Sequence, residues 1–270
     1  MSGLQEKKAR LVEILQEMGS LVVAFSGGVD SSLLLAVAAK LYNVKLMAVT
    51  ITSVSFSEQE KKDAEAMIHR LGVYHRYVEV DQMSLPEFVS NTPDRCYYCK
   101  KEIFSIIRKM ADAEGFTYVV DGGNVDDQCD FRPGRRALKE LGVRSPMEEA
   151  GLTKRDIREI SREMGLFTAA KPSSACLASR IPYGETITPE KLMQVEKAEE
   201  ILRILGFTQV RVRCHGTLAR IEVDPAQIVL LAQPSTRARL TKLYKDIGFK
   251  YVCADLEGFR SGSMNEELEK

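Results

Sequence analysis

The residues best suited to chemistry form a short polar loop between two apolar segments. Residues 26–32 read S-G-G-V-D-S-S, after the apolar run 21–25 and before the apolar stretch 33–41. Gly27 and Gly28 have no Cβ atom, so the backbone can turn tightly there and come close to a ligand. The amide groups of such a loop and of the helix that follows point at an anion. The sequence therefore predicts a phosphate-binding loop between a strand and a helix.

The side chains of this loop fit the same prediction. Ser26, Ser31 and Ser32 supply hydroxyl donors, and the Asp30 carboxylate could hold Mg²⁺ against phosphates. The run is not a Walker A loop, because no G-K-[ST] follows. It resembles the PP-loop of the ATP pyrophosphatases, which cleave ATP between the α and β phosphates and adenylate a substrate. The alternative is an ordinary strand–helix turn with polar residues.

Cysteines form a second candidate site. The chain has six cysteines, of which Cys96 and Cys99 form a C-x-x-C pair just before an expected helix at 99–114. Such a pair can place two thiolates on one metal ion or one cluster iron. No second pair with zinc-finger spacing exists, so the sequence does not support a closed zinc site. A redox pair and two buried, unreactive thiols are the alternatives.

Cys176 stands alone in the segment K-P-S-S-A-C-L-A-S-R, between Lys171 and Arg180. Nearby cations lower the pKa of a thiol and favour the reactive thiolate. The residues by themselves leave two interpretations open, a functional thiol on an active-site loop and a packing residue. No role follows from the sequence for the other cysteines, which are Cys129, Cys214 and Cys253.

Charged residues mark two further places. Asp121, Asn124, Asp126 and Asp127 crowd the tip of an expected strand, where carboxylates could share Mg²⁺ or simply make a turn. The arginines after them could hold a carboxylate or phosphate: Arg132, Arg135 and Arg136. A later strand carries two arginines that alternate and so share a face, either as a phosphate grip or as a solvated surface: Arg211 and Arg213.

The elements that would position these groups alternate in the first half of the chain. The patterns predict helices at 4–18, 31–41, 57–71, 99–114 and 153–164, and strands at 21–25, 44–51, 74–80 and 117–121. This alternation predicts an α/β fold with a doubly wound parallel sheet, whose ligands bind outside the carboxyl ends of the strands. The phosphate-binding loop and the D-G-G-N segment at 121–124 both fall at that edge.

The second half has a different pattern. Residues 168–189 are rich in Pro, Ser and Gly, which indicates both a domain boundary and an active-site segment. Beyond it, helices at 189–205, 225–232 and 235–247 and strands near 208–213, 217–223 and 249–254 predict a small α+β module. We therefore expect a PP-loop domain over 1–170 and a C-terminal substrate or oligomerisation domain over 171–270.

Composition limits the partners. Lys and Arg number 38 against 38 Asp and Glu, so no net charge favours nucleic acid or an anionic membrane. No apolar run is long enough to span a bilayer, and the N-terminus has no apolar signal core. We expect a soluble cytoplasmic protein.

Over nearly its whole length the chain resembles the LarE family, sulfur transferases that help to build the nickel-pincer nucleotide cofactor of lactate racemase. The resemblance rests on these motifs: S-G-G-V-D-S at 26–31, N-T-P-D at 91–94, D-G-G-N-V-D-D…D-F-R-P-G at 121–134, S-R-I-P-Y-G at 179–184, V-R-V-R-C-H at 210–215, A-R-I-E at 219–222 and G-F-R-S-G at 258–262. The PP-loop alone is shared with many enzymes, whereas its combination with the C-terminal motifs is specific.

This resemblance implies an enzyme that uses ATP and Mg²⁺ to adenylate a carboxylate of pyridinium-3,5-biscarboxylic acid mononucleotide. Sulfur then replaces AMP, and the second carboxylate follows. In one branch of the family a single cysteine gives up its sulfur and becomes dehydroalanine. In another, three cysteines bind a 4Fe–4S cluster whose open iron would hold an extra sulfide. Cys96, Cys99 and Cys176 match the second branch, with an unidentified sulfide donor, and sacrifice of Cys176 is the alternative.

The same resemblance implies roles for single residues. The loop residues would bind the ATP phosphates, and they are Ser26, Gly27, Gly28, Asp30, Ser31 and Ser32. Asp30 and Asp126 are the candidates for Mg²⁺, Arg180 should lie near the activated carboxyl, and Asp30, Cys176 and Arg180 are the catalytic candidates. The substrate phosphate falls to Arg211 and Arg213. A homo-oligomer with contacts from the C-terminal module is also implied.

Three competing functions differ in class. A tRNA thiolase of the PP-loop group also uses cysteines or a cluster, but the chain lacks a basic surface with interleaved aromatic residues. An amidating PP-loop enzyme that uses ammonia would leave the cysteines unexplained. A nucleotide-binding or iron–sulfur scaffold protein would turn nothing over.

Overall fold

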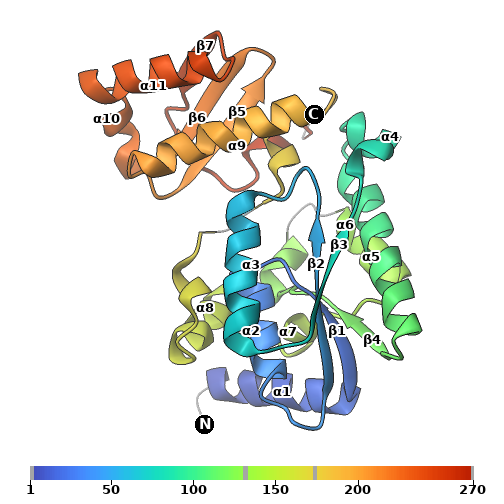
Figure 1. Ribbon diagram of the computed structural model, residues 1–270. Coiled ribbons are helices and arrows are strands. Elements are labelled where there is room, and N and C mark those ends of the chain that lie inside the picture. Colours follow the sequence, from blue (N-terminus) through green and yellow to red (C-terminus); the bar gives the residue numbers. More distant parts are fainter. Residues whose placement is uncertain (1–2, 130–132, 173–174, 269–270) are drawn as a thin grey trace. The chain divides into compact units, whose positions relative to one another are not determined.

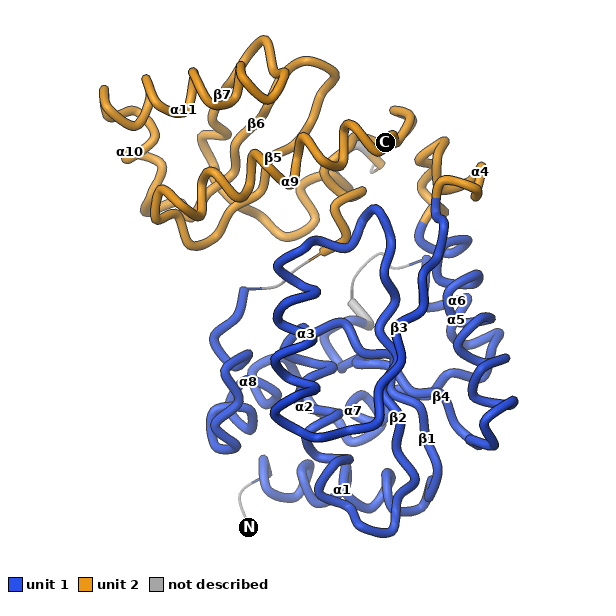
Figure 2. Tube along the Cα trace, viewed as in Figure 1, with its two compact units in different colours: residues 1–82, 96–174 blue, residues 83–95, 175–270 orange. Residues whose placement is uncertain are grey.

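The protein is divided into two compact units. The computed structural model describes residues 3–129, 133–172 and 175–268. Unit 1 comprises Met1–Gln82 and Cys96–Ser174, and unit 2 comprises Met83–Arg95 and Ala175–Lys270 (Figure 2). Residues 83–95 thus belong with the C-terminal part of the chain, although they lie in the first half of the sequence. The boundary at residue 170 between independently folding domains stays a prediction.

Unit 1 is built on a parallel sheet with the strand order β3-β2-β1-β4 (Figure 1). Its strands are β1 (Ser20–Ala24), β2 (Lys45–Thr52), β3 (His75–Glu79) and β4 (Tyr118–Val120). In the central strand, Val22 pairs in register with Met47 on one side and Val119 on the other. All three side chains are buried, as expected for parallel strands that are covered on both faces.

Helices cover both faces of this sheet, so the predicted doubly wound α/β fold is confirmed. They are α1 (Gly3–Met18), α2 (Val29–Ala38), α3 (Glu58–Leu71), α5 (Arg95–Ala113), α6 (Gly134–Glu140), α7 (Pro146–Glu149) and α8 (Lys154–Glu163). Val23 packs into a core with α1, α2 and α8, whereas its neighbour Val22 packs against Phe104 and Ile107 of α5. Successive residues of a strand face opposite sides, and here each side has its own apolar core.

The starts of two helices, α8 and α5, show when neighbouring residues are enough to predict where a helix begins. The capping box predicted at Thr153 and Asp156 is present at the start of α8. The predicted start of the helix at residue 99 is wrong, because α5 begins at Arg95. The turn in which the Arg95 amide donates to the Thr92 carbonyl oxygen (2.9 Å) leads directly into the helix. The C-x-x-C pair therefore lies on the helix and not before it.

Unit 2 is the small α+β module that the sequence predicts. Its elements are α4 (Pro86–Val89), α9 (Pro189–Ile204), β5 (Val210–His215), β6 (Leu218–Val223), α10 (Ile228–Leu231), α11 (Pro234–Asp246) and β7 (Tyr251–Ala254). The sheet order is β5-β6-β7, with β5 and β6 antiparallel and β6 and β7 parallel. Buried Tyr244 of α11 joins the helices by donating its hydroxyl to the Ala198 carbonyl oxygen (2.9 Å).

Residues 83–95 are joined to the rest of unit 2 by hydrogen bonds, several of which involve buried Asn91. The Asn91 side-chain amide donates to the carbonyl oxygens of Ile181 (3.2 Å) and Pro182 (2.7 Å). The Asn91 backbone carbonyl oxygen accepts from the Gly184 amide (3.0 Å). The N-T-P-D and S-R-I-P-Y-G motifs are far apart in sequence but pack together in one unit.

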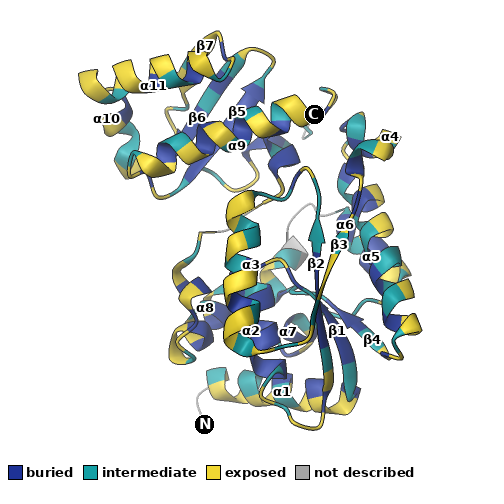
Figure 3. Ribbon diagram, viewed as in Figure 1, coloured by how far each residue is buried: buried dark blue, intermediate teal, exposed yellow. Residues whose placement is uncertain are grey.

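In unit 1 the strand β1 is mostly buried and β3 is largely exposed, and in unit 2 the strand β5 is buried and β7 is largely exposed (Figure 3). Among the residues that the structure describes, no helix is both long and apolar enough to cross a membrane.

Candidate functional site

The phosphate-binding loop connects β1 to α2 at the carboxyl end of the central strand (Figure 1). Gly27 has a φ of 70°, which L residues with a side chain rarely adopt. A Cβ atom there would lie 3.0 Å from the Ala64 amide nitrogen and 3.2 Å from the Glu60 carbonyl oxygen of α3. The loop therefore requires glycine for both its backbone conformation and its close approach to α3.

The loop hydroxyls fold the loop onto itself. The Ser26 and Ser31 oxygens lie 3.2 Å apart, and the Gly28 amide donates to the Ser26 oxygen (3.4 Å). The Ser31 hydroxyl donates to the Gly28 carbonyl oxygen (3.3 Å). Ser32 is fully buried, and its hydroxyl has no hydrogen-bond partner within the described part of the chain. Ser26 and Ser31 thus hold a tight turn that leads into the start of α2, and a helix start of this kind is where anions bind.

The D-G-G-N segment contacts this loop, as the sequence predicts. A Cβ atom on Gly122 would lie 3.0 Å from the Ser31 amide nitrogen and 3.2 Å from the Asp30 Cβ atom. Asp121 accepts from the Ser145 hydroxyl (2.6 Å) and from the Gly123 amide (3.1 Å), so its carboxylate shapes the turn.

The next residues of this segment also serve the turn. Asn124 accepts from the Asp126 amide (3.0 Å), and Asp127 accepts from the Asn124 amide (3.1 Å). Turn chemistry therefore accounts for Asp121, Asn124 and Asp127. Asp126 is exposed, and the bond that its own carboxylate accepts comes from outside the turn.

Lys154 connects the two carboxylates that the sequence proposes for Mg²⁺. Its ammonium group forms an ion pair with Asp30 Oδ2, and its backbone amide donates to Asp126 Oδ2 (2.7 Å). The other Asp30 oxygen, Oδ1, is buried and has no hydrogen-bond partner among the described residues. A buried carboxylate oxygen without a donor suits a hard cation such as Mg²⁺, so the chemistry of the site fits that ion.

A second lysine lies on the other side of the loop. Lys171 donates to the Gly27 carbonyl oxygen (3.3 Å) and pairs with Asp63 of α3 (2.5 Å). Two half-buried ammonium groups therefore flank the phosphate-binding loop. The sequence reading missed Lys154, although the capping box at Thr153 places it in the first turn of α8.

The C-x-x-C pair lies in the first turns of α5, where residues three apart share one face. Cys99 is buried and its sulfur accepts from the Gln82 side-chain amide (3.2 Å), whereas Cys96 is half-buried. The start of α6 lies close to this pair, because a Cβ atom on Gly134 would lie 3.2 Å from the Cys96 carbonyl oxygen. The pair can present two sulfurs to one ligand on the same face of a helix.

The single cysteines differ in setting. Burial raises the pKa of the Cys214 thiol to about 11, so this residue is a neutral packing thiol at physiological pH. Cys253 of β7 is exposed. Partial desolvation of its thiol raises the pKa of this residue as well. The Cys129 side chain and Arg132 lie outside the described residues.

Arg180 holds the Cys176 segment of unit 2. Its side chain is buried and pairs with Glu199 of α9 through two hydrogen bonds (2.7 and 3.1 Å). The same guanidinium donates to the carbonyl oxygens of Ala175 (2.6 Å) and Cys176 (3.1 Å). Cys176 itself is exposed. Arg180 thus fixes the backbone on which the Cys176 thiol stands.

Glu199 is the fully buried counter-ion of this arrangement. Burial by itself would raise the pKa of its carboxyl, but the charge and hydrogen bonds of Arg180 and the charge of Arg211 outweigh burial and lower it. A third contact comes from Arg203 of the same helix (2.7 Å). The carboxylate is therefore ionised in the folded protein.

The Arg211 and Arg213 side chains are buried, so the alternative of a solvated strand face is wrong. Arg213 forms two bonds to Glu222 (2.9 and 2.7 Å) and one to the Ser179 carbonyl oxygen (3.0 Å). In register, however, Glu222 stands opposite Arg211, and the contact with Arg213 is diagonal. The two arginines thus lie on one face, as predicted, but bind different groups.

Arg211 lies at the centre of a positive cluster. Its guanidinium donates to the Val210 carbonyl oxygen (2.7 Å) and stacks over the Phe259 ring at 5.1 Å. Burial, together with the charge of Arg180, lowers its pKa to about 10. Arg180, Arg211 and Arg213 lie with two buried glutamates, Glu199 and Glu222, which leaves this interior with positive charge that suits an anion.

Sequence reasoning gave Glu199 and Glu222 no role. A single glutamate in a helix or strand is too common to carry a signal, and only the tertiary packing shows that both are buried between arginines. The three cysteines of the predicted cluster are divided between the units, Cys96 and Cys99 in unit 1 and Cys176 in unit 2. Within the described ranges no group of three or more His, Cys, Asp and Glu side chains is arranged to hold a metal ion. A common site for the three sulfurs stays a prediction.

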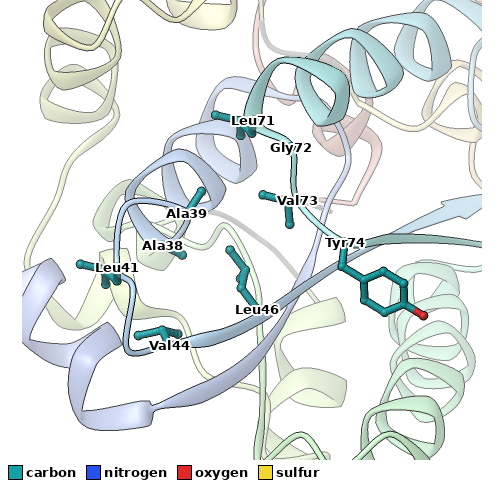
Figure 4. A pocket seen from close by; sticks show the side chains of 9 residues that line it. All are labelled: Ala38, Ala39, Leu41, Val44, Leu46, Leu71, Gly72, Val73 and Tyr74. Carbon is teal, nitrogen blue, oxygen red and sulfur yellow. The ribbon is translucent and has the colours of Figure 1, made fainter.

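Unit 1 also has an apolar pocket at the amino ends of β2 and β3 (Figure 4). Its lining residues are Ala38, Ala39, Leu41, Val44, Leu46, Leu71, Gly72, Val73 and Tyr74. This pocket lies at the opposite end of the strands from the phosphate-binding loop, and tyrosine is the one ionisable side chain among its lining residues.

Comparison with known proteins places these sites in a family. A pyridinium-3,5-bisthiocarboxylic acid mononucleotide synthase of Lactiplantibacillus plantarum is 40% identical over 271 residues, which cover 100% of this chain and 98% of the relative. The chain belongs to the LarE family. Like other LarE proteins it is an ATP-dependent, sulfur-transferring enzyme of the PP-loop group, and it uses ATP with Mg²⁺.

Other matches differ in how much of the chain they cover. An uncharacterized protein of Synechocystis is 42% identical over 99% of this chain and 100% of its own length. Residues 13–108, which include the phosphate-binding loop, match the asparagine synthase family. A tRNA-specific 2-thiouridylase of Sphingopyxis alaskensis is more distant, with 29% identity over 67% of this chain and 56% of its own length. The LarE likeness is full-length, whereas the thiouridylase likeness is partial.

Proposed function

We propose that this LarE protein converts the two carboxylates of pyridinium-3,5-biscarboxylic acid mononucleotide into thiocarboxylates, in the biosynthesis of the nickel-pincer cofactor. One observation carries the proposal, the 40% identity to the L. plantarum synthase over the full length of both chains. The reaction needs an ATP site and a site for the anionic substrate. The described residues have features that suit each of these sites.

The first half-reaction is adenylation. A substrate carboxylate oxygen attacks the α-phosphorus of ATP, the bond from that phosphorus to the bridging oxygen of the β-phosphate breaks, and pyrophosphate leaves. We assign phosphate binding to the loop residues Ser26, Gly27, Gly28, Asp30, Ser31 and Ser32. Asp30, through its buried Oδ1, and Asp126 are assigned to Mg²⁺, which neutralises phosphate charge as pyrophosphate departs.

In the second half-reaction sulfide-level sulfur attacks the carbonyl carbon of the acyl adenylate, the bond from that carbon to the AMP oxygen breaks, and AMP leaves. We assign the substrate phosphate to the positive interior around Arg211 and Arg213, where a phosphate would balance the excess of buried arginine charge. Arg180 is assigned to the activated carboxyl and to the position of Cys176, whose carbonyl oxygen it holds. Glu199 keeps the Arg180 guanidinium in a fixed orientation, and Glu222 does the same for Arg213.

For the sulfur source we propose a 4Fe–4S cluster bound by Cys96, Cys99 and Cys176, with sulfide from an unidentified donor. Three thiolates leave one iron open to hold an additional sulfide. The helical placement of Cys96 and Cys99 supports this proposal, because sacrifice of one cysteine would need no such pair. A homo-oligomer with contacts from unit 2 belongs to the same proposal and is tested by light scattering.

The experiment is a turnover assay with anaerobically purified protein, ATP, Mg²⁺, sulfide and the biscarboxylic acid mononucleotide. We expect AMP, pyrophosphate and a thiocarboxylate product by mass spectrometry, with about four iron and four acid-labile sulfide per chain. A Cys99→Ala variant should lose the cluster but still release pyrophosphate. A chain that loses the elements of H₂S from Cys176 once, and then transfers no further sulfur, would instead show the sacrificial mechanism. Thiolation of tRNA without conversion of the mononucleotide would contradict the proposed substrate.

A further inference from the structure

Lys154 pairs with the same carboxylate, that of Asp30, to which a metal ion would bind. Its ammonium group is paired with Asp30 Oδ2, although the two residues are 124 positions apart in sequence. Both side chains are largely buried, with exposed fractions of 29% for Lys154 and 23% for Asp30. A charge pair in such surroundings is stronger than one in bulk water. Any cation that binds Asp30 must therefore compete with Lys154.

The pair is incomplete in a way that an ordinary structural ion pair is not. Asp30 Oδ1 is buried and accepts no hydrogen bond in the described part of the structure, so the carboxylate is only half satisfied. Buried oxygens without a donor are rare and call for a physical explanation. A site that exchanges one cation for another provides it, because the second oxygen is then kept for the incoming ion.

The backbone of Lys154 is anchored separately from its ammonium group. The amide donates to Asp126 Oδ2 (2.7 Å), and the Thr153 capping box fixes the start of α8 around it. The long, flexible lysine stem can therefore turn from Asp30 to a neighbouring anion without moving the helix. The nearest place built for an anion is the Ser26–Ser31 loop, which shares Asp30 with the pair.

We propose that Lys154 is an exchangeable counter-ion of Asp30, which Mg²⁺ displaces onto the ATP phosphates. Without nucleotide, the lysine neutralises Asp30 and keeps metal affinity low. When ATP arrives with Mg²⁺, the metal takes Asp30 and the released ammonium binds a phosphate oxygen. Lys154 thus makes metal and nucleotide bind cooperatively. The inference rests on the proposed role of Asp30 as a Mg²⁺ ligand.

The test uses Mn²⁺ as the metal probe, followed by electron paramagnetic resonance, and the methylene analogue of ATP that cannot be cleaved between the α and β phosphates. In Lys154→Met, the affinity of the nucleotide-free protein for Mn²⁺ should rise about tenfold, because Asp30 loses its competitor. The affinity for the analogue at saturating Mg²⁺ should fall about tenfold, because a charged contact to phosphate is lost. The factor by which nucleotide raises Mn²⁺ affinity should shrink accordingly. A purely structural ion pair would not move the two affinities in opposite directions.

Two controls match this variant. Lys154→Arg keeps the positive charge and should keep the cooperativity. Lys7→Met removes another lysine–aspartate pair of α8, with Asp156 (2.7 Å), and should leave both affinities as they are. Unchanged or weaker Mn²⁺ binding in folded Lys154→Met would overturn the inference.

Asp30→Asn separates this outcome from failure of the proposed metal site. If Asp30→Asn binds Mn²⁺ as well as the wild-type chain does, Asp30 is no ligand and both proposals fail. If it loses Mn²⁺ while Lys154→Met gains none, only the exchange fails. A crystal structure of the wild-type complex with Mg²⁺ and the analogue gives a test that needs no variant. Lys154 Nζ on a phosphate oxygen supports the exchange, and Lys154 Nζ still on Asp30 contradicts it.

Discussion

The two units prepare for anions in opposite ways. In unit 1 the loop at residues 26–31 presents backbone amides and small hydroxyls, and its charged groups are partly open to water. In unit 2 Arg180 and Arg213 are buried in the interior, and each is held by a buried glutamate. The loop of unit 1 depends on a particular backbone conformation. The arginines of unit 2 depend on a balance of charge where water is scarce. Substitutions in the two sites should therefore have different effects. Those in the loop should lower the affinity for ATP, and those among the buried ion pairs should lower the stability of the protein.

The largest effect is expected from Glu199→Gln in unit 2. The change leaves the buried Arg180 guanidinium without its carboxylate, and breaking one side of a buried pair costs about 3–5 kcal/mol. Urea unfolding measures the loss. The matched control is Glu185→Gln, whose pair with Lys191 is partly exposed and should be worth less than about 1 kcal/mol. Equal losses for the two variants would show that burial does not strengthen the Glu199 pair.

A pH series sharpens the same point. Because Arg180 and its neighbours outweigh burial and lower the pKa of Glu199 in the folded state, the pair stabilises the protein above the unfolded pKa of about 4.3. This contribution is lost as the pH falls through the lowered folded pKa. The stability difference between the wild-type chain and Glu199→Gln should therefore be full near neutral pH and shrink in strong acid. A difference that stays constant throughout the acid range would exclude an ionised Glu199.

A smaller effect on stability, with a larger effect on binding, is expected from Gly27→Ala in unit 1. The new Cβ atom would lie 3.0 Å from the Ala64 amide nitrogen at a φ of 70°, at a cost of about 1–3 kcal/mol. We expect at least a tenfold loss of ATP affinity by calorimetry. Gly19→Ala is the control, because Gly19 has a similar φ of 65° but open space around its Cβ position. Retained ATP affinity in Gly27→Ala would show that the close approach to α3 does not shape the loop.

The smallest effect should come from Thr153→Ala. It removes the hydroxyl that caps α8 and accepts from the Asp156 amide (3.3 Å), at a cost of about 1 kcal/mol. Ser57→Ala is matched to it, since Ser57 caps α3 in a second capping box. Both should lower the unfolding temperature similarly, but only Thr153→Ala should also weaken ATP binding, because it loosens the anchor of Lys154. Equal ATP affinities in the two variants would remove that link.

Local chemistry explains what the sequence could predict in unit 1. The loop at 26–32 is set by two glycines and their hydroxyl neighbours, all within seven residues, and the capping box spans only Thr153 to Asp156. The parallel sheet followed from the alternation of buried strands with helices that each end in a short turn. Such features depend on neighbouring residues, so their physical causes are readable in the chain itself. The start of α5 was mistaken because a cysteine pair looks like a loop ligand and gives no helix signal of its own.

By itself, the sequence determined the family, the α/β class, the phosphate-binding loop and the pairs of residues that share a strand or helix face. Only the tertiary structure decided which charges meet. It pairs Lys154 with Asp30, Glu199 with Arg180, and Glu222 with Arg213, which lies diagonal to it across the strands. The physical reason is that an ion pair depends on distance and burial, which folding sets between segments far apart in the chain. A lone glutamate or lysine has the same local pattern whether it is solvated or holds a site together.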